Sequence, residues 1–369
     1  MTDNLGCPPC LPSAVALRLF RQSRCSLLLA LLLAGPSAAR AEDHALYIHH
    51  LPSESHVSVW RIGSEGSSRR LPLQSDAEQS GALGRGSTLP LPSPDGRWLA
   101  FTRENDVWLL DADTGESKRI THVGAPADDH YLSVFVYLTA WSPDSSRILY
   151  HVAAGLAEDA EGEGPELKER PREYGYFVFD RAEEAHLPLE LPGQFQAWLP
   201  DGDFLLLPEE ARPLVQPLLR FNPLTKTLAA VGSLRGWYGQ ISVSADGRWA
   251  LAGVGQQSEG RLTTQLIRID LATGETSPVT PVGEWADYQW PRFSPSARFI
   301  AYVRQHEMDT DSWPRQSLVV DDRPIYFCAG FPKRLDFAWI NDSTLVASCG
   351  DEIVILNAAN GKVKGKPHH

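Results

Sequence analysis

Acidic and histidine side chains in two short segments are the residues of this sequence best suited to chemistry. Asp128 lies close to His130, and His306 lies close to Asp309. Carboxylates and imidazoles are common ligands of catalytic metal ions. These four residues are therefore the candidate metal ligands for a lyase or hydrolase reaction. Charged side chains of solvated loops explain them more simply, so we expect no metal and no other cofactor.

Motifs for nucleophilic and phosphate chemistry are missing from the sequence. The segment 232–236 resembles a G-x-S-x-G nucleophile elbow, but its serine stands at the wrong position. No H-E-x-x-H motif and no phosphate-binding glycine loop occurs. The segment 111–116 resembles a Ca²⁺ loop but lacks the remaining oxygen ligands, and we interpret it as a turn between strands. The sequence therefore favours a protein that is not an enzyme.

A repeat in the sequence indicates the structural elements that must position any site. A phrase of the type Ser-Pro-Asp-Gly-Arg-Trp returns at intervals of about 50 residues, a period typical of stacked or radial repeats. The six copies, some of them weakened, begin at Ser93, Trp141, Trp198, Ser244, Phe293 and Trp339. The repeat therefore indicates the fold, whereas the function depends on the sites that the fold carries.

Each copy is a polar turn followed by a β-rich run. After the first copy, strands are expected at 97–102, 107–110 and 117–121, and the innermost strand of the next unit at 133–141. Each unit thus has four short antiparallel strands, which we name a to d from the inside outwards. Such units are typical of an all-β fold, the β-propeller. The large residues before the turns are expected to pack between blades.

The number of blades depends on the N-terminal region. Segments 45–50, 56–62 and 69–73 match strands b, c and d of a first blade. Strand a of this blade would fall in the predicted N-terminal leader, residues 1–41. This strand is therefore either missing or supplied by the C-terminus. We expect seven blades, one of them incomplete or composite. Six blades with additional N-terminal strands is the alternative.

Residues 1–41 are predicted to be a cleaved signal peptide. Arg18, Arg21 and Arg24 precede an apolar run at 27–34, and Ala39-Arg40-Ala41 forms a small-residue cleavage site. The run is too short to span a bilayer as a helix. We therefore expect an exported protein, periplasmic or extracellular, whose mature chain is a single propeller domain (42–369) without a transmembrane segment.

The net charge limits the classes of partner, and the cysteine content bears on the redox state of the compartment. The formal net charge is −12, and removal of residues 1–41, with four arginines and one aspartate, leaves −15. Such a balance argues against a nucleic-acid partner, because binding surfaces for nucleic acid must neutralise phosphates. Cys328 and Cys349 remain in the mature chain. They could form a disulfide in an oxidising compartment, or be two small buried apolar residues.

The repeat resembles that of a known family. The phrase at 93–101, followed by a strand c that ends in Leu-Asp-Ala-Asp-Thr-Gly-Glu at 110–116, resembles the WD-like propeller repeat of TolB. It is also similar to the propeller of prolyl-oligopeptidase-type enzymes. The resemblance covers 85–360 and implies a propeller with partner binding in the bacterial envelope. Residues 42–85 are too short for the separate α/β domain of TolB, and a hydrolase domain has no room.

The loops indicate where a partner would bind. In a four-stranded blade the a–b and c–d turns share one face, and the b–c and d–a loops share the other. The latter are long here and rich in aromatic and acidic residues, and aromatic anchors are enriched in binding hot spots. The candidate partner-binding residues are Tyr131, Trp237, Tyr238, Trp285, Tyr288, Trp290 and Trp313. Capping of the channel is their alternative role.

These observations predict an exported, non-enzymatic propeller that binds a protein partner through its b–c and d–a loops, as a binding module or scaffold. Two alternatives stay open. One is a propeller enzyme, a lyase or hydrolase with its site at the channel mouth, and the other is a glycan-binding module.

Overall fold

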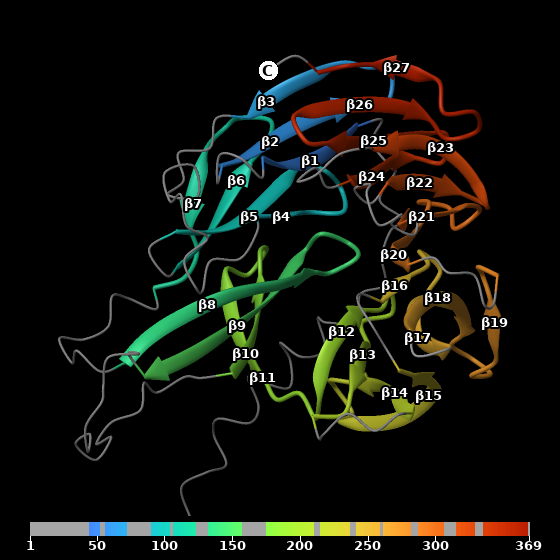
Figure 1. Cartoon of the computed structure of the whole chain (residues 1–369). Helices are drawn as coiled ribbons and strands as arrows, with labels where there is room; N and C mark the ends of the chain where they lie inside the picture. The colour runs from blue at the N-terminus through green and yellow to red at the C-terminus, as the bar shows by residue number, and fades with distance from the viewer. Residues whose placement is uncertain are drawn as a thin grey trace, which may run out of the picture. The chain divides into compact units, whose positions relative to one another are not determined.

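Antiparallel strands in seven sheets make up the computed structural model of this chain, a seven-bladed β-propeller as the repeat predicts (Figure 1). The structure describes residues 44–51, 56–71, 90–103, 106–122, 132–156, 175–209, 215–236, 241–258, 261–281, 287–305, 315–328 and 335–367. No helix occurs in these ranges, and therefore none that is long and apolar enough to cross a membrane.

In the part of the chain that the structure describes, six blades have four consecutive strands, a to d, and the first blade has three. The strands of blades 1 to 4 are β1 (His44–Leu51), β2 (His56–Gly63), β3 (Ser68–Leu71); β4 (Leu91–Pro92), β5 (Trp98–Arg103), β6 (Asp106–Asp111), β7 (Ser117–Arg119); β8 (Leu132–Trp141), β9 (Arg147–Leu156), β10 (Gly175–Asp180), β11 (Ala185–Leu189); β12 (Gln194–Trp198), β13 (Phe204–Leu207), β14 (Val215–Asn222) and β15 (Thr227–Arg235). Those of blades 5 to 7 are β16 (Ser242–Val243), β17 (Trp249–Ser258), β18 (Arg261–Asp270), β19 (Thr276–Pro278); β20 (Asp287–Phe293), β21 (Ile300–Gln305), β22 (Gln316–Val320), β23 (Arg323–Cys328); β24 (Leu335–Asn341), β25 (Thr344–Cys349), β26 (Glu352–Asn357) and β27 (Val363–Gly365).

The repeated phrase builds the turn between strands a and b. The Ser93 hydroxyl accepts a hydrogen bond from the Trp98 N–H (2.8 Å) and donates one to Asp95 Oδ1 (2.5 Å). The same buried arrangement recurs at Ser142 and at Ser244. One serine thus fixes the backbone and orients the aspartate, which explains why these residue types return at a fixed spacing.

Turns of neighbouring blades contact one another at one rim of the ring. The Asp95 N–H donates to Ser145 Oγ of the next blade (3.0 Å), and the Ser296 N–H donates to Asp342 Oδ1 in the same way (3.0 Å). Gly96 has a positive φ of 69°, and an added Cβ would stand 3.3 Å from the His44 carbonyl oxygen. These contacts place the a–b turns at a common level.

Seven clusters of buried apolar side chains hold neighbouring sheets together, one at each interface. Between blades 1 and 2, for example, Leu46 packs in one cluster with Leu99. The last cluster joins Tyr47 of blade 1 to Val346 and Ile353 of blade 7. Every sheet therefore has neighbours on both faces, and the circle closes through side-chain packing between blades 7 and 1.

The aromatic residues before the turns largely pack between blades, as predicted. Trp141 and Trp198 are buried at the interfaces of blades 2–3 and 3–4, and Trp339 packs against the cluster of blades 6–7. Trp141 Nε1 also donates to the Leu91 carbonyl of the preceding blade (2.8 Å). Phe293 is half-buried and belongs to none of the seven clusters.

Three strands of the first blade lie in the described residues, and the place that the sequence assigns to its strand a lies outside them. Its strands β1, β2 and β3 contribute Leu46, Val59 and Leu71 to the interface with blade 2, as strands b, c and d do in other blades. The C-terminal strand β27 pairs with β26 in the seventh sheet, so it does not supply the strand a of blade 1.

We predict that Ser244→Ala lowers the free energy of unfolding by about 1–3 kcal/mol, because it leaves the Trp249 N–H without its hydroxyl acceptor at a buried turn. The same substitution at Ser117, which is exposed at the start of β7, is the matched control and should change it by less than about 0.5 kcal/mol. Chemical denaturation measures both values. Equal effects in the two variants would contradict this role of the repeated serine.

Candidate binding surface

The two rims of the ring differ in how much of them is irregular. We call the rim of a–b and c–d turns, such as 93–97 and 111–116, the turn rim, and that of the b–c and d–a connections the loop rim. Turn-rim residues are tied by repeated ion pairs, since Arg97 lies 3.2 Å from Asp111 and Arg147 lies 2.9 Å from Asp180. The turn rim is thus a uniform structural surface, and variation is concentrated at the loop rim.

Strand lengths shape the loop rim. The a–b turns lie at one level, so a longer inner strand must project further at the opposite rim. Strands β8 and β9 of blade 3 have ten residues each, as do β17 and β18 of blade 5. Blade 4 lies between them, and its strands β12 and β13 have only five and four. The strand pairs β8–β9 and β17–β18 therefore extend further towards the loop rim than β12 and β13 do.

An aromatic row crosses the third blade. Tyr137 of β8 lies directly opposite His151 of β9, which in turn lies opposite Tyr176 of β10. The ring centroids are 6.3 Å apart for the first pair and 4.6 Å apart for the second. All three side chains are half-buried. Residues opposite one another share one face of a sheet, so the three rings form one continuous group, the aromatic row.

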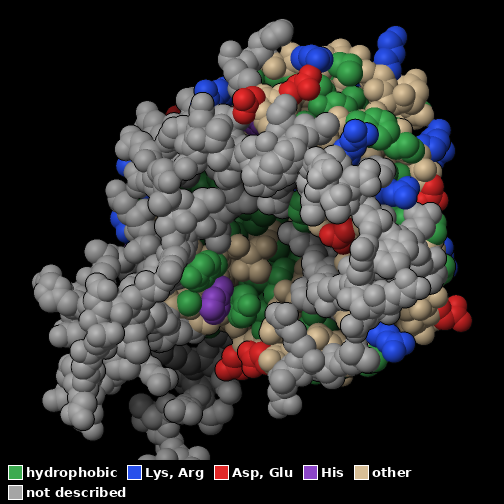
Figure 2. Space-filling view, viewed as in Figure 1, with side chains coloured by type: hydrophobic (Ala, Val, Ile, Leu, Met, Phe, Trp, Pro, Cys, Tyr) green, Lys and Arg blue, Asp and Glu red, His purple; other side chains and the backbone are tan. Residues whose placement is uncertain are grey.

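The aromatic row faces blade 4. Leu149 and Val178 lie two residues lower on the same strands, and both belong to the cluster between blades 3 and 4. Because side chains alternate between the two faces of a strand, His151 and Tyr176 face the same way. Tyr176 and Phe195 pack against that cluster. In Figure 2 a histidine flanked by hydrophobic side chains lies in a hollow over the third blade.

Burial and charge shift the pKa values of two members of the aromatic row. Partial burial lowers the pKa of His151 below that of an exposed histidine, so the imidazole is neutral at pH 7. Partial burial is the larger cause that raises the pKa of Tyr176, and the negative charge of Glu209 raises it further. Glu209 is exposed, and it follows the short strand β13 of blade 4. The row is thus uncharged, amphipathic and next to a carboxylate, which suits binding better than proton transfer.

Most of the residues that the sequence proposed for binding lie outside the described residues. These are Tyr131, Trp237, Tyr238, Trp285 and Trp313, together with the candidate metal ligands Asp128, His130, His306 and Asp309. Their roles stay predictions. Among the residues that the structure does describe, no group of three or more His, Cys, Asp or Glu side chains is arranged to hold a metal ion.

The structure places the remaining two candidates, Tyr288 and Trp290, in the innermost strand of blade 6, β20, instead of in the preceding loop. Tyr288 is buried between blades 5 and 6, where its ring meets that of Tyr302 edge-on at 5.7 Å. Trp290 is half-buried at a bulge, with a φ of 51°, and packs against the cluster of blades 6 and 7. Tyr288 thus serves the core, and we leave it out of the surface proposed below.

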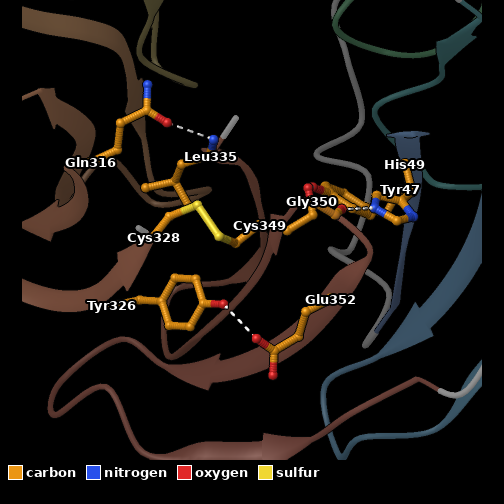
Figure 3. Close-up of a disulfide and its surroundings, with 10 residues drawn as sticks. Tyr47, His49, Gln316, Tyr326, Cys328, Leu335, Cys349, Gly350 and Glu352 are labelled. Atoms are coloured by element: carbon orange, nitrogen blue, oxygen red, sulfur yellow. Dashed lines mark hydrogen bonds between the residues drawn. A yellow bond between two sulfur atoms is a disulfide. The ribbon is translucent and has the colours of Figure 1, made fainter. Parts of the chain in front are cut away.

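A disulfide lies at the loop rim. Cys328 ends β23 of blade 6 and Cys349 ends β25 of blade 7, and their sulfur atoms are bonded with a Cα–Cα distance of 5.6 Å (Figure 3). Close by, the Leu335 N–H donates to Gln316 Oε1 (2.7 Å) across the same interface. The bond therefore joins two blades whose interface the apolar cluster already fills.

The seam between blades 7 and 1 is held by buried polar contacts. The Tyr47 hydroxyl donates to Ser348 Oγ (2.6 Å), and burial raises the pKa of Tyr47 so far that this phenol keeps its proton. His49 Nε2 lies 2.6 Å from the Gly350 carbonyl oxygen (Figure 3). A carbonyl only accepts, so Nε2 carries the proton. These groups help to close the ring.

Sequence reasoning missed the aromatic row. Its members lie in three different strands, at positions that are half-buried and carry no motif. The residues themselves carry little signal, since Tyr150 and His151 are adjacent on β9 and only the pairing with β10 brings His151 opposite Tyr176. Recognising the row requires the register of β8, β9 and β10, which the connection at 157–174 leaves open.

Residues 51–153 match the family model described as the N-terminal region of dipeptidyl peptidase IV (DPP IV). No curated protein matches the sequence significantly. Among solved structures, TolB from Acinetobacter baumannii is 15% identical with a TM-score of 0.47, covering 76% of this chain and 61% of that one. This chain therefore spans less than two thirds of the length of that TolB.

Two further solved structures are similar. The β-propeller domain of the Trilobed protease from Pyrococcus furiosus is 14% identical with a TM-score of 0.48, over 86% of this chain and 94% of that one. An oligogalacturonate lyase in complex with manganese is 15% identical with a TM-score of 0.45, over 75% and 73%. The resemblance to TolB-like and prolyl-peptidase-type propellers that the repeat predicted is found among these matches.

We predict that the double variant Cys328→Ala/Cys349→Ala loses about 2–4 kcal/mol of unfolding free energy, because the bond closes a loop of 21 residues in the unfolded chain. Denaturant titration with and without a thiol reductant measures this loss. The reductant should destabilise the wild type and leave the double variant unchanged. A wild type that is insensitive to full reduction would contradict the prediction.

We predict that His151 titrates below about pH 6.5, because burial disfavours its charged form. The unfolded chain then binds more protons than the folded one as the pH falls through this range, so acidification destabilises the fold. Imidazole resonances in NMR give the midpoint directly. His151→Leu should lose less stability than the wild type between pH 7.5 and 5.5. A midpoint above that of an exposed histidine would contradict the assignment.

Proposed function

We propose that this protein is an exported binding module or scaffold that recognises a protein partner through the loop rim of its propeller. The aromatic row of Tyr137, His151 and Tyr176 is the observation that carries the proposal. Tyrosine side chains combine a large apolar ring with a polar tip, and they are enriched at binding hot spots. Their half-buried rings are held on paired strands, so little side-chain entropy remains to be lost on binding.

The shape of the rim supports a macromolecular partner. The long strand pairs β8–β9 and β17–β18 lie on either side of the short inner strands of blade 4, and the aromatic row lies on the face of blade 3 that packs against blade 4. A partner segment that enters between these strand pairs would contact the row. The loop-rim aromatics Tyr131, Trp237, Tyr238, Trp285 and Trp313 would extend the same surface.

Export is supported by two independent observations. The N-terminal 41 residues have the composition of a signal peptide. The disulfide between Cys328 and Cys349 suits an oxidising compartment, because such bonds are rare in reducing ones. A periplasmic or extracellular location is therefore part of the proposal, and so is a partner from the same compartment.

Native co-purification followed by mass spectrometry tests the proposal. We expect wild-type protein to retain a specific partner, and Tyr137→Leu/Tyr176→Leu to reduce its recovery at least about tenfold. Val363→Ala is the control, since it removes an apolar side chain that is 42% exposed on β27, next to the turn rim. Thermal unfolding of each variant confirms that the fold persists.

Three results would contradict the proposal. The control variant could lose the partner as strongly as the double variant, or the double variant could retain it fully. The purified protein could also turn over a substrate with no partner bound, which would favour a propeller enzyme.

A further inference from the structure

Arginine side chains contact an aromatic ring and a carboxylate together at two points of the turn rim. The guanidinium of Arg248 lies 4.7 Å from the centroid of the Trp249 ring, and its Nε lies 3.5 Å from Asp270 Oδ2. The same combination recurs at Arg97. A ring face and a carboxylate both attract a guanidinium, which is planar enough to stack and still presents N–H groups at its edge. A ring next to a carboxylate is thus a place that holds an arginine in this chain.

The aromatic row and Glu209 supply the same two components near the loop rim. The rings of His151 and Tyr176 have centroids 4.6 Å apart, and both side chains are half-buried. Glu209 follows β13, whose Leu206 belongs to the cluster against which Tyr176 packs. Glu209 is exposed, and its negative charge adds to the effect of burial on the pKa of Tyr176. Two rings and a carboxylate therefore lie together where blades 3 and 4 meet.

The third component, a cation, is absent from this group in the part of the chain that the structure describes. Among those residues, no arginine or lysine lies over the ring of His151 or Tyr176, and none pairs with Glu209. The Tyr176 hydroxyl and the His151 imidazole make no hydrogen bond within the same ranges. His151 is neutral at pH 7, because burial lowers its pKa, and so does not repel a cation. The group thus has a negative charge and polar atoms that remain available to a ligand.

We propose that the aromatic row and Glu209 bind an arginine side chain of the partner protein. This inference rests on the proposed function and names the anchor residue of the partner. The guanidinium stacks on the rings of His151 and Tyr176 and pairs with the Glu209 carboxylate. Arginine is among the residues that dominate the binding energy of protein interfaces. The formal net charge of this chain, −12, also favours a partner surface that is basic.

Blocked arginine, N-acetyl-arginine amide, is the probe for this site. It is titrated into isotope-labelled protein, and the ring resonances of His151 and Tyr176 are followed by NMR. Blocked citrulline, which has nearly the same shape without the charge, and blocked lysine are the comparison ligands. We expect arginine to bind at least about fivefold more tightly than citrulline, because a neutral urea lacks the attraction of a cation to the rings and the carboxylate. Lysine should bind at least about threefold more weakly than arginine, because its ammonium group cannot stack as a plane.

The variant Glu209→Gln removes the negative charge and keeps the shape of the side chain. We expect it to bind blocked arginine at least about threefold more weakly and blocked citrulline equally well, because only the ion pair is lost. Glu275→Gln is the matched control, since Glu275 is also exposed but lies at the turn rim of blade 5. It should bind both ligands as the wild type does. Amide spectra of the two variants show whether the fold persists.

Four results would overturn the inference. Blocked arginine could leave the resonances of His151 and Tyr176 unchanged, or it could bind no more tightly than blocked citrulline. Blocked lysine could bind as tightly as blocked arginine. The two glutamate variants could also lose the same affinity for arginine, which would show that the position of Glu209 is not special.

Failure here is distinguishable from failure of the proposed function. Co-purification tests the rings through Tyr137→Leu/Tyr176→Leu, whereas the titration tests charge through Glu209→Gln and citrulline. If the partner is lost with the ring variant but blocked arginine does not bind, the proposed function stands and the arginine anchor is rejected. If blocked arginine binds as expected but the ring variant retains the partner fully, the proposed function fails and the arginine anchor of the partner fails with it.

Discussion

Packing of each sheet against both of its neighbours is the constraint on which this structure depends. A single blade of four short strands cannot bury its own faces, so each apolar cluster is shared by two blades. The last interface obeys the same rule, since Tyr47 of the first blade packs with Val346 of the seventh. Within the described residues no sheet contains strands from both ends of the chain. The Tyr47–Ser348 hydrogen bond reinforces the closing interface, and the disulfide joins the neighbouring blades 6 and 7.

The same constraint divides the molecule into a structural and a variable rim. Turns at one rim are locked between blades by bonds such as that from the Asp95 N–H to Ser145 Oγ, and their residue types repeat. At the opposite rim nothing requires the strands to end together. The ten-residue strands of blades 3 and 5 can therefore project beyond the short inner strands of blade 4, and aromatic side chains such as Tyr176 can occupy the difference in height.

Much of the fold could be predicted from the sequence because the turns have a local cause. A serine that bonds its own turn, as Ser93 does, leaves a signal in adjacent residues, and so does strand alternation. The three described strands of the first blade were predictable for the same reason. The site was less predictable, because it depends on register. Tyr288 and Trp290 looked like loop residues but belong to β20, whereas His151 joins two tyrosines that lie 14 and 25 residues away in the chain.

Site-specific photocrosslinking in the native compartment tests the central claim most directly. A photoreactive phenylalanine analogue is placed at Tyr176 in the aromatic row or at Val363, which lies on β27 next to the turn rim. If the loop rim of blade 3 binds a partner, irradiation yields a defined crosslinked protein from position 176 and none from position 363. A crosslink from position 363 alone, or identical products from both positions, would contradict the account.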